Sequence, residues 1–479
     1  MSKKKDSAWK VWGYIIFAVI AFLALYLMPT PEGLEPAAQT SMALFVFALI
    51  LWIARPIPIY QTSIILVLLL PLLGAVEKQK DAFGALGFDI IWLMVAAFVI
   101  TSAMSATNLG KRIALVLTTK FAKTPTKLLV VFVVVNYILA FFVPSTTARA
   151  SLLVPIALIV LEIYQEYPGE SKFGKLMMLQ GVQNNALATS VVLTATSAQV
   201  LAIGFIKEQT GVQIGYLDWL LGSLPQAILT TIIAFFIGLK LYQNKKTDKE
   251  KLEKATAVLK EKLNEMGPIS NKEKRALVIF LLTLVLWATG DYQEALVGFK
   301  ITTEQTAVLS MLLCLLPGIG VITWKEANIK WDLMIFSAGA YAVGKAVDKT
   351  GAASWAVSQF VGAIGLDKIN PSLVAVVLIF ITVFSHLIFT SKTVRTTILI
   401  PAIISLAQQL GIDPVPLALT CSFGIAMTIC LPPHSKVNTL YFGTDYFTVK
   451  DELVFGLITC LISSISLSIV YFTWIRLIV

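Results

Sequence analysis

Apolar runs of about 20 residues recur from one end of this 479-residue chain to the other. A run of that length is what an α-helix needs to cross the hydrocarbon core of a membrane. Only 14% of the residues are charged, against about 25% in soluble proteins. Because backbone groups inside a membrane must bond to one another, such runs form helices rather than open sheets. The sequence therefore predicts an all-α polytopic membrane protein.

Two stretches break the apolar pattern in the same way. Residues 143–160 and 389–406 align without a gap. Five positions agree, namely Ser145/Ser391, Thr147/Thr393, Arg149/Arg395, Leu153/Leu399 and Pro155/Pro401. Hydroxyls and a cation at membrane depth are costly and usually mark a substrate path. Their repetition predicts a transporter built from two internal repeats, and chance similarity between two hydroxyl-rich turns is the alternative.

Each of these stretches lies inside a longer apolar segment. Residues 125–164 are interrupted at Pro144-Ser-Thr-Thr147, and residues 370–410 are interrupted at 390–393. Two interpretations compete: two short spans, or one re-entrant hairpin whose tip carries the polar residues. Non-helical backbone at membrane depth is tolerated where protein or a cavity surrounds it. Because Ser and Thr side chains can satisfy the freed backbone groups, we expect two re-entrant hairpins.

A long segment with a polar centre follows each predicted hairpin. Residues 175–204 carry amides and hydroxyls at 183–190 and 194–199, and residues 415–442 carry a polar, proline-containing stretch at 431–438. A helix broken near the membrane midplane would hold such groups, whereas a lipid-facing helix would not. The other spans are expected at residues 11–28, 37–54, 59–76, 88–106, 217–242, 276–288, 306–322, 333–361 and 453–475. With the two broken helices, this predicts about 11 transmembrane spans.

One long hydrophilic segment, residues 243–274, separates six predicted spans from five. It carries nine lysines and six acidic residues, and a surplus of positive charge is typical of cytoplasmic loops. Residues 248–265 have helical spacing, which predicts a surface helix that serves as a solvated linker or, as the alternative, binds a partner. With Lys3–Lys5 on the same side, the N-terminus is expected in the cytoplasm and the C-terminus outside the plasma membrane. Without the first span, each half has five spans and a hairpin, and this odd count makes the halves inverted-topology repeats.

The sequence argues against enzymes, nucleotide-driven pumps and nucleic-acid-binding proteins. It has no phosphate-binding loop, Rossmann fingerprint, HExxH or CxxC. The net charge of +10 is concentrated in residues 3–5 and the hydrophilic segment, where it sets topology. The four cysteines fall in or beside apolar segments and are interpreted as packing residues, as is His386. These cysteines are Cys314, Cys421, Cys430 and Cys460. We therefore expect no catalytic residues, cofactor or metal.

At the two hairpin tips, the sequence resembles the divalent anion/sodium symporter family, also called the INDY family. That family carries a Ser-Asn-Thr signature at each of two re-entrant hairpins. Here the signatures stand as Ser145-Thr146-Thr147 and Ser391-Lys392-Thr393, with hydroxyls at both ends and no central Asn. Where the family has Thr-Pro-Pro-Asn turns in its broken helices, this chain has Thr-Ser-Ala-Gln at 196–199 and Ser-Lys-Val-Asn at 435–438. The resemblance covers nearly the whole chain.

The resemblance implies a homodimer in which a transport domain moves like an elevator against a scaffold domain. It also implies small dicarboxylates as substrates, such as succinate, malate, fumarate and 2-oxoglutarate. The implied division is a scaffold at 1–124 and 275–366, a transport domain at 125–242 and 367–479, and a cytoplasmic linker at 243–274.

The departures from the family pattern concern charge. Lys392 takes the place of one hairpin Asn, and His434 and Lys436 lie beside the second turn. A fixed ammonium repels sodium and can replace its electrostatic role toward an anion. The chain therefore resembles the dicarboxylate exchanger branch, with no sodium requirement. The alternative is a sodium- or proton-coupled symporter of di- or tricarboxylates.

The candidate substrate ligands follow from these tips and turns. The first set is Ser145, Thr146, Thr147, Ser391, Lys392 and Thr393. The second set, with substrate or charge-compensating roles, is Arg149, Arg395, His434, Ser435, Lys436, Asn438, Thr196 and Gln199. Half-helix N-termini at the tips would add amides and a partial positive charge. Each residue also has a structural alternative, because hydroxyls cap helices, lysines extend to the interface and broken helices need amides.

Overall fold

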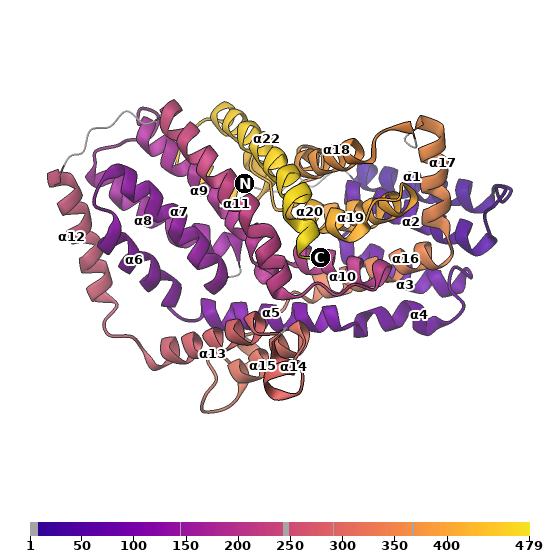
Figure 1. Cartoon of the computed structure of the whole chain (residues 1–479), viewed down its shortest axis with the longest axis horizontal. Helices are drawn as coiled ribbons and strands as arrows, with labels where there is room; N and C mark the ends of the chain where they lie inside the picture. The colour runs from indigo at the N-terminus through magenta and orange to yellow at the C-terminus, as the bar shows by residue number, and fades with distance from the viewer. Residues whose placement is uncertain (1–7, 144, 243–248, 291, 366–367) are drawn as a thin grey trace.

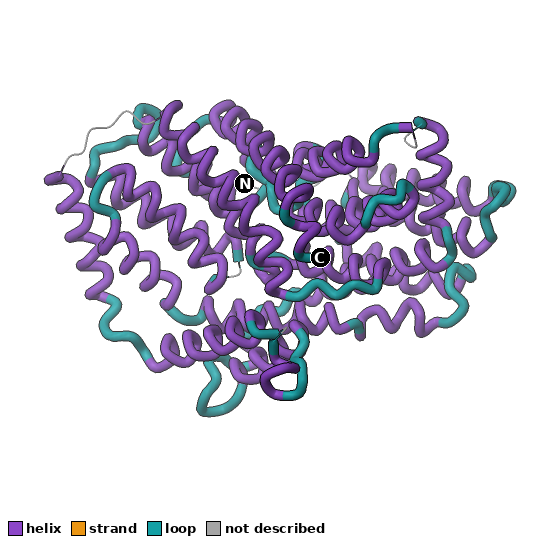
Figure 2. The backbone as a smooth tube through the Cα atoms, in the orientation of Figure 1, coloured by secondary structure: helices purple, strands orange, loops and turns teal. Residues whose placement is uncertain are grey.

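The computed structural model describes residues 8–143, 145–242, 249–290, 292–365 and 368–479. Lys3–Lys5, Pro144 and the start of the hydrophilic segment, which the sequence interpretation used, lie outside these ranges. Within the described ranges every regular element is a helix, and no strand occurs, as Figure 2 shows. The predicted all-α polytopic class is confirmed.

Six α-helices lie before the first repeat unit in the described part of the chain, with a 3₁₀ turn, η1 (Gly84–Gly87), between the fourth and the fifth. These are α1 (Ala8–Leu27), α2 (Pro36–Ala54), α3 (Ile59–Leu72), α4 (Gln79–Phe83), α5 (Asp89–Ser105) and α6 (Leu109–Phe121). Helix α1 packs against α2, but large apolar side chains such as Trp12 and Phe17 are exposed along it. An exposed apolar surface of this kind is suited to lipid or to another protein.

The first repeat unit contains a helix pair, a broken helix and a long final helix. Its elements are α7 (Pro125–Phe142), α8 (Thr146–Ile163), α9 (Lys172–Val191), the 3₁₀ turn η2 (Leu193–Ala195), α10 (Ser197–Thr210) and α11 (Tyr216–Tyr242). Helices α7 and α8 pack together around the break at the first tip. Each is long and apolar enough to cross a membrane, so the re-entrant form of this pair stays a prediction.

The first helix is broken as predicted, and the break falls at the second of its two polar clusters, 183–190 and 194–199. Helix α9 continues through residues 183–190, and the interruption occurs at residues 192–196. The amide side chains of residues 183–185 make local and tertiary hydrogen bonds. Asn184 Nδ2 donates to the Gln180 carbonyl at 2.8 Å, and Gln183 Nε2 donates to the Phe455 carbonyl at 3.3 Å. These amides therefore stabilise packing rather than break the helix.

The second half begins with helices that pack on the first six. They are α12 (Lys249–Glu265), α13 (Asn271–Ala288), α14 (Gln293–Val297), α15 (Thr303–Leu315), η3 (Trp324–Glu326), α16 (Trp331–Lys349) and α17 (Ala352–Ile364). Helix α16 packs against α3, and α15 packs against α5. The span predicted at 333–361 is two helices, because Gly351 adopts a left-handed conformation with φ of 76° that ends α16.

The helix predicted in the hydrophilic segment is present, and one side of it packs on the first half. Helix α12 packs against α6 and α8 and buries Ala255 and Leu259. The chain after it is held by Arg112 of α6, whose Nε lies 2.9 Å from Glu273 Oε1. The same guanidinium donates to the carbonyls of residues 266–268. The connection between the halves is therefore anchored to the first half.

The second repeat unit follows the same element order as the first. Its elements are α18 (Pro371–Phe384), η5 (Ser385–Leu387), α19 (Lys392–Gln409), α20 (Pro414–Gly424), η6 (Pro432–His434), α21 (Lys436–Phe442), α22 (Val449–Thr473) and η7 (Ile475–Leu477). Helix α10 of the first unit packs against α19 of the second, and α11 packs against α22. Figure 1 shows these contacts near the centre, with α6, α8 and α12 toward one end and α3, α16 and α17 toward the other.

Seven helical segments within the described ranges are long and apolar enough to cross a membrane. They include α1, α2, α7, α8, α11 and the segments that end in α5 and η7. Shorter apolar helices α3, α15, α18 and α20 accompany them. The number of spans and the inverted orientation of the halves stay predictions.

Candidate functional site

Four helix N-termini meet at one cavity of about 260 Å³ between the two repeat units. The helices are α8, α10, α19 and α21, and their N-cap residues are Ser145, Thr196, Ser391 and Ser435. The first amides of a helix lack intrahelical partners, and the helix dipole adds a partial positive charge there. Four such ends around one cavity create a site suited to an anion.

The cavity is lined from both halves of the chain. Its lining residues are Thr146, Thr147, Val182, Asn185, Ala186, Thr196, Thr390, Lys392, Thr428, His434, Ser435, Lys436, Val437 and Asn438. The polar residues supply hydroxyl and amide donors, and two lysines supply full positive charges. The described lining residues include no carboxylate. The cavity is therefore electropositive as well as polar.

Lys392 is the charged residue most closely built into the site. It is the first residue of α19 and is partly buried. It interacts electrostatically with Arg149 and Arg395, so three cations lie close together. Like charges at short range are unfavourable in a medium of low dielectric constant. An anion in the cavity would relieve this repulsion.

The two symmetry-related arginines are fully buried and do not line the cavity. Arg395 Nε donates to Ser385 Oγ at 2.8 Å, and its Nη2 donates to the Thr382 carbonyl at 2.8 Å. Its Nη1 donates to the carbonyls of Ile425 and Met427, each at 3.2 Å. Arg395 thus joins the end of α18, beside the second tip, to the unwound stretch after α20. This is a positioning role rather than substrate contact.

Arg149 is bonded much less completely. Its Nη2 donates to the Asn185 carbonyl at 3.3 Å and forms a short hydrogen bond with Thr189 Oγ1. Its Nε and Nη1 have no hydrogen-bond partner, although the side chain is fully buried. Because Asn185 lines the cavity, Arg149 lies directly behind the cavity wall. It supplies positive charge there without touching the cavity.

The turn residues Gln199 and Asn438 orient the broken helices. Asn438 Nδ2 donates to the Leu431 carbonyl at 3.1 Å and to Glu452 Oε1 at 2.8 Å. Gln199 Nε2 donates to the Thr189 carbonyl at 2.6 Å, and its Oε1 accepts from the Thr196 amide at 3.1 Å. Both amides are therefore engaged in holding the backbone, although Asn438 also lines the cavity.

The hydroxyls at the two tips divide into caps and cavity residues. Ser145 Oγ and Ser391 Oγ each accept a backbone amide hydrogen bond at 3.3 Å, from Ala148 and Val394. Thr147 lines the cavity, whereas Ser391 and Thr393 are not among its lining residues. The sequence interpretation did not propose Thr390 and Thr428, which do line it. They were not proposed as ligands because neither occupies one of the positions at which the two aligned stretches agree.

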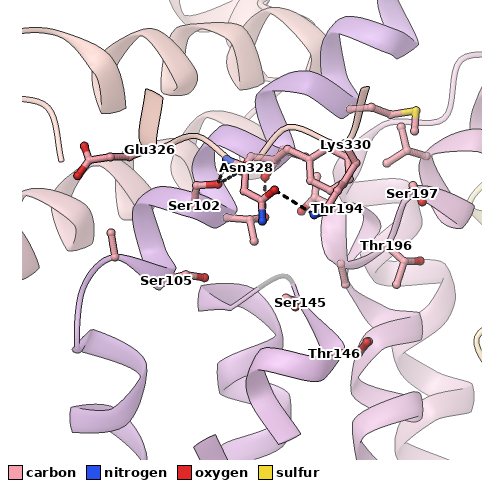
Figure 3. A pocket seen from close by; sticks show the side chains of 17 residues that line it. Ser102, Ser105, Ser145, Thr146, Thr194, Thr196, Ser197, Glu326, Asn328 and Lys330 are labelled. Atoms are coloured by element: carbon pink, nitrogen blue, oxygen red, sulfur yellow. Dashed lines mark hydrogen bonds between the residues drawn. The ribbon is translucent and has the colours of Figure 1, made fainter. Parts of the chain in front are cut away.

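A second cavity, of about 550 Å³, adjoins the first. Thr146 and Thr196 line both cavities, so the two are neighbours. Figure 3 shows Ser102 of α5, Asn328 and Lys330 on one side, with Ser145 and Thr146 at the tip of α8 facing them. The backbone amide of Asn328 donates to Ser102 Oγ at 2.9 Å. Residues 326–330 were not predicted to lie here, because only tertiary packing brings them to the cavity.

Comparison with known proteins identifies the chain. The family model described as "Sodium:sulfate symporter transmembrane region" matches residues 8–479. The chain belongs to this family of divalent anion/sodium symporters. The family that the hairpin tips suggested is thereby confirmed, and so is the coarser conclusion of a multi-pass membrane transporter.

The chain aligns with two characterised relatives from Escherichia coli strain K12 over nearly its full length. A citrate/succinate antiporter is 26% identical, with 96% of each chain covered. An L-tartrate/succinate antiporter is 28% identical, with 98% of this chain and 99% of that one covered.

Two solved structures have the same fold. The YdaH transporter of Alcanivorax borkumensis, described as having an unusual topology, has a TM-score of 0.58 and 12% identity, with 98% of each chain covered. Neisseria gonorrhoeae MtrF has a TM-score of 0.57 and 12% identity, with 97% of this chain and 94% of that one covered. These likenesses concern the fold alone.

Proposed function

We propose that this chain exchanges small dicarboxylates across the cell membrane and does not require sodium. The observation that carries the proposal is the cavity where four helix N-termini meet Lys392 and Lys436 without a lining carboxylate. The names of the two relatives, antiporters of citrate or L-tartrate against succinate, support a carboxylate substrate and an exchange reaction.

The cavity has the chemistry that a dicarboxylate needs. Such a substrate carries two negative charges about 4–7 Å apart, from extended-chain bond lengths. Taking it out of water requires hydrogen-bond donors and positive potential for both carboxylates. The end of α8 offers amides and the hydroxyls of Thr146 and Thr147, and the end of α19 adds the ammonium of Lys392. Succinate, malate, fumarate and 2-oxoglutarate all meet this description.

The absence of a sodium requirement follows from the fixed charge. In a symporter, sodium ions bring positive charge to the site and leave with the substrate. Here Lys392 stands at the tip, and an ammonium repels a cation while attracting the anion. A sodium ion would also lack a carboxylate ligand among the described lining residues.

The same charge favours obligate exchange. An empty carrier would move uncompensated Lys392 through the apolar part of the membrane. Insertion scales put this cost at about 2.5–3.5 kcal/mol for one lysine at the bilayer centre, or about a hundred-fold in rate. A bound dianion neutralises the charge, so the loaded carrier crosses more easily.

The deciding experiment is counterflow in proteoliposomes. Vesicles loaded with succinate should take up labelled succinate quickly, in sodium and in choline alike, and empty vesicles should not. The variant Lys392→Asn should allow uptake into empty vesicles, and its matched control is Lys349→Asn, because Lys349 is an exposed lysine at the end of α16. Equal uptake into empty and loaded vesicles by the wild-type protein would show that the fixed-charge argument is wrong.

A sodium- or proton-coupled di- or tricarboxylate symporter is the second candidate. It is favoured by the description of the matching family, which names a sodium:sulfate symporter. Uptake into empty vesicles that depends on a sodium or proton gradient would select this candidate.

An elevator motion of a homodimer is proposed for the conformational cycle. Residues 1–124 and 275–366 form the scaffold, and residues 125–242 and 367–479 form the transport domain. Two ion pairs join α10 to scaffold helices across this boundary, Lys345–Glu208 at 3.0 Å and Lys207–Asp89. The larger cavity lies at the same boundary. In an elevator these contacts break in each cycle.

Cross-linking tests the motion. In the double variant Glu208→Cys/Lys345→Cys, a short bifunctional thiol reagent should stop exchange, and reductive cleavage of the link should restore it. The native cysteines are buried and serve as an internal control. Full exchange by fully cross-linked protein would exclude sliding at this boundary. Mass measurement in detergent, with and without cross-linking between chains, tests the dimer.

Labelling tests the proposed orientation. Lys260 is an exposed residue of α12, and the expected cytoplasmic location predicts that Lys260→Cys is labelled only from inside the cell. A cysteine appended after Val479 should be labelled only from outside. Labelling of both from one side would sink the inverted-repeat arrangement.

A further inference from the structure

Three buried side chains with metal-binding atoms meet beside the second broken helix. A ring nitrogen of His386 and the sulfurs of Cys430 and Cys460 all lie within 4.8 Å of one another. The two sulfurs are 3.8 Å apart, and each of the three residues has 0% exposure. They come from η5, from the stretch before η6 and from α22. None lines either cavity of the candidate site.

His386 is prepared to act as a ligand. Its Nδ1 lies 2.7 Å from the Val383 carbonyl, which can only accept a hydrogen bond, so Nδ1 carries the proton. The lone pair is then on Nε2. Nε2 has no hydrogen-bond partner, although the ring is fully buried. Metal-bound histidines usually have this arrangement, in which a backbone carbonyl fixes the ring through its other nitrogen.

We propose that Nε2 of His386 and the sulfurs of Cys430 and Cys460 bind one monovalent copper ion. Sulfur and imidazole are the soft ligands that Cu(I) prefers. With metal–sulfur bonds of about 2.3 Å, two sulfurs on one ion lie about 3.8–4.0 Å apart at tetrahedral to trigonal angles. The two sulfurs lie 3.8 Å apart in this structure, which matches the spacing that one shared ion requires. Binding removes one proton from each thiol.

The ligand number and the charge favour copper over zinc. Structural zinc sites are almost always four-coordinate, whereas the cluster offers three ligands within the described residues. Two thiolates and one Cu(I) carry a net charge of −1. The guanidinium of Arg395 interacts electrostatically with Cys460 and compensates this charge. This proposal gives Cys430, Cys460 and His386 a role beyond the packing that the sequence predicted for them.

A bound ion would connect three segments that shape the second half of the anion cavity. His386 follows Thr382 and Ser385, whose oxygens accept from Arg395. Cys430 precedes His434, which lines the cavity. Copper would thus rigidify the end of α18 beside the second tip and the stretch that leads into α21. Because it binds the folded state, it should also raise the unfolding temperature.

The test is an anaerobic titration of the purified, reduced full-length protein in detergent. Cu(I) is added in competition with the chromogenic chelator bathocuproine disulfonate. We expect one high-affinity Cu(I) per chain, a raised unfolding temperature, and an X-ray absorption spectrum with two sulfur neighbours and one nitrogen neighbour. In Cys430→Ala, Cys460→Ala and His386→Gln, the affinity should fall by about 100-fold or more, given the 10–100-fold effects of outer-shell partners alone.

The matched control is Cys421→Ala, a buried cysteine on α20 of the same broken helix, outside the cluster. It should bind Cu(I) like the wild type. Unchanged affinity in Cys430→Ala or Cys460→Ala would overturn the proposal. So would a preference for Zn²⁺ at these ligands. A Cys430–Cys460 disulfide in protein purified without reductant, with no copper binding after reduction, would show a redox pair instead.

The absorption spectrum keeps the test decisive when a variant fails to fold, because it uses the wild-type protein. A spectrum without two sulfur neighbours would exclude this site. These readouts do not depend on transport, so they are independent of whether dicarboxylates are exchanged.

Discussion

The two polar tips share a backbone plan but differ in charge and in the bonding of their arginines. Each tip starts a helix with a serine cap and places an arginine four residues after that cap. The first tip carries threonine where the second carries Lys392. Arg395 uses all three of its guanidinium nitrogens in hydrogen bonds, whereas Arg149 has two without partners.

Two exactly equivalent halves would contribute equally to the charge of the cavity and to the bracing of the backbone. The two halves of this chain differ in both respects. The second half holds both lysines that line the cavity, and its arginine bonds the end of α18 to the unwound stretch after α20. The first half contributes hydroxyls and amides to the cavity. Its arginine, Arg149, lies behind the cavity-lining residue Asn185 and adds positive charge there. Internal repeats thus preserve the shape of a site while its charge is redistributed.

The largest expected effect comes from the two arginines. Arg395→Gln leaves buried carbonyls at residues 382, 425 and 427 without this donor, at a cost of about 1–3 kcal/mol for each one that stays unsatisfied. Arg149→Gln should cost about 1–2 kcal/mol, because the guanidinium is bonded to only two residues, Asn185 and Thr189. The unfolding temperature in detergent measures both. Equal destabilisation by the two substitutions would erase the asymmetry.

The next effect concerns the charge at the tips. Lys392→Asn should weaken dicarboxylate binding by about 10–150-fold, since hydrogen bonds to charged groups are worth about 1.5–3 kcal/mol. It should also allow leak through the empty carrier. Thr146→Asn, at the matching position of the first tip, should change binding far less. Binding and counterflow of both variants provide the comparison.

The swap Thr146→Lys/Lys392→Thr sharpens this prediction. It keeps the total charge but moves the ammonium to the other half. Binding that returns to the wild-type value would mean that only the net charge of the cavity matters. We expect the swap to remain weak, because Arg149 is already an incompletely bonded cation beside the first tip.

The sequence predicted the fold class, the repeat and the polar tips because these depend on local patterns. Apolar length, serine caps and the paired arginines are all visible in one dimension. It could not show which of the two polar clusters, 183–190 or 194–199, breaks the first helix, because the first cluster bonds to distant partners such as Phe455, 272 residues away. It also missed the different bonding of Arg149 and Arg395, because tertiary packing determines their hydrogen-bond partners.

The anion cavity was also only partly predictable. Eight of the proposed ligands line it, namely Thr146, Thr147, Lys392, His434, Ser435, Lys436, Asn438 and Thr196. Thr428 and Asn185 reach it through the packing of α9 and the stretch after α20. Burial of a hydroxyl against a cavity depends on three-dimensional packing, which no motif spacing records.

A smaller effect distinguishes the threonines of the tips. Thr147 lines the cavity, and Thr393, its counterpart, does not. Thr147→Ala should therefore raise the Kd for succinate by about 10-fold, from the loss of one hydrogen bond to a charged group. Thr393→Ala should leave Kd within about two-fold. Isothermal titration of the purified variants measures this, and equal effects would mean that the second tip reaches the substrate as well.

The smallest effect concerns the capping serines. Ser145 and Ser391 make cap hydrogen bonds of equal length, 3.3 Å each, so alanine at either position should cost about 1 kcal/mol. Transport should nevertheless separate them, because Ser145 lines the larger cavity and Ser391 is not among its lining residues. Ser145→Ala should raise the KM of exchange a few-fold, while Ser391→Ala should leave KM unchanged. Matched shifts in unfolding temperature with unequal KM values would place the approach route on the first half. Equal KM values would mean that Ser145, like Ser391, is only a cap.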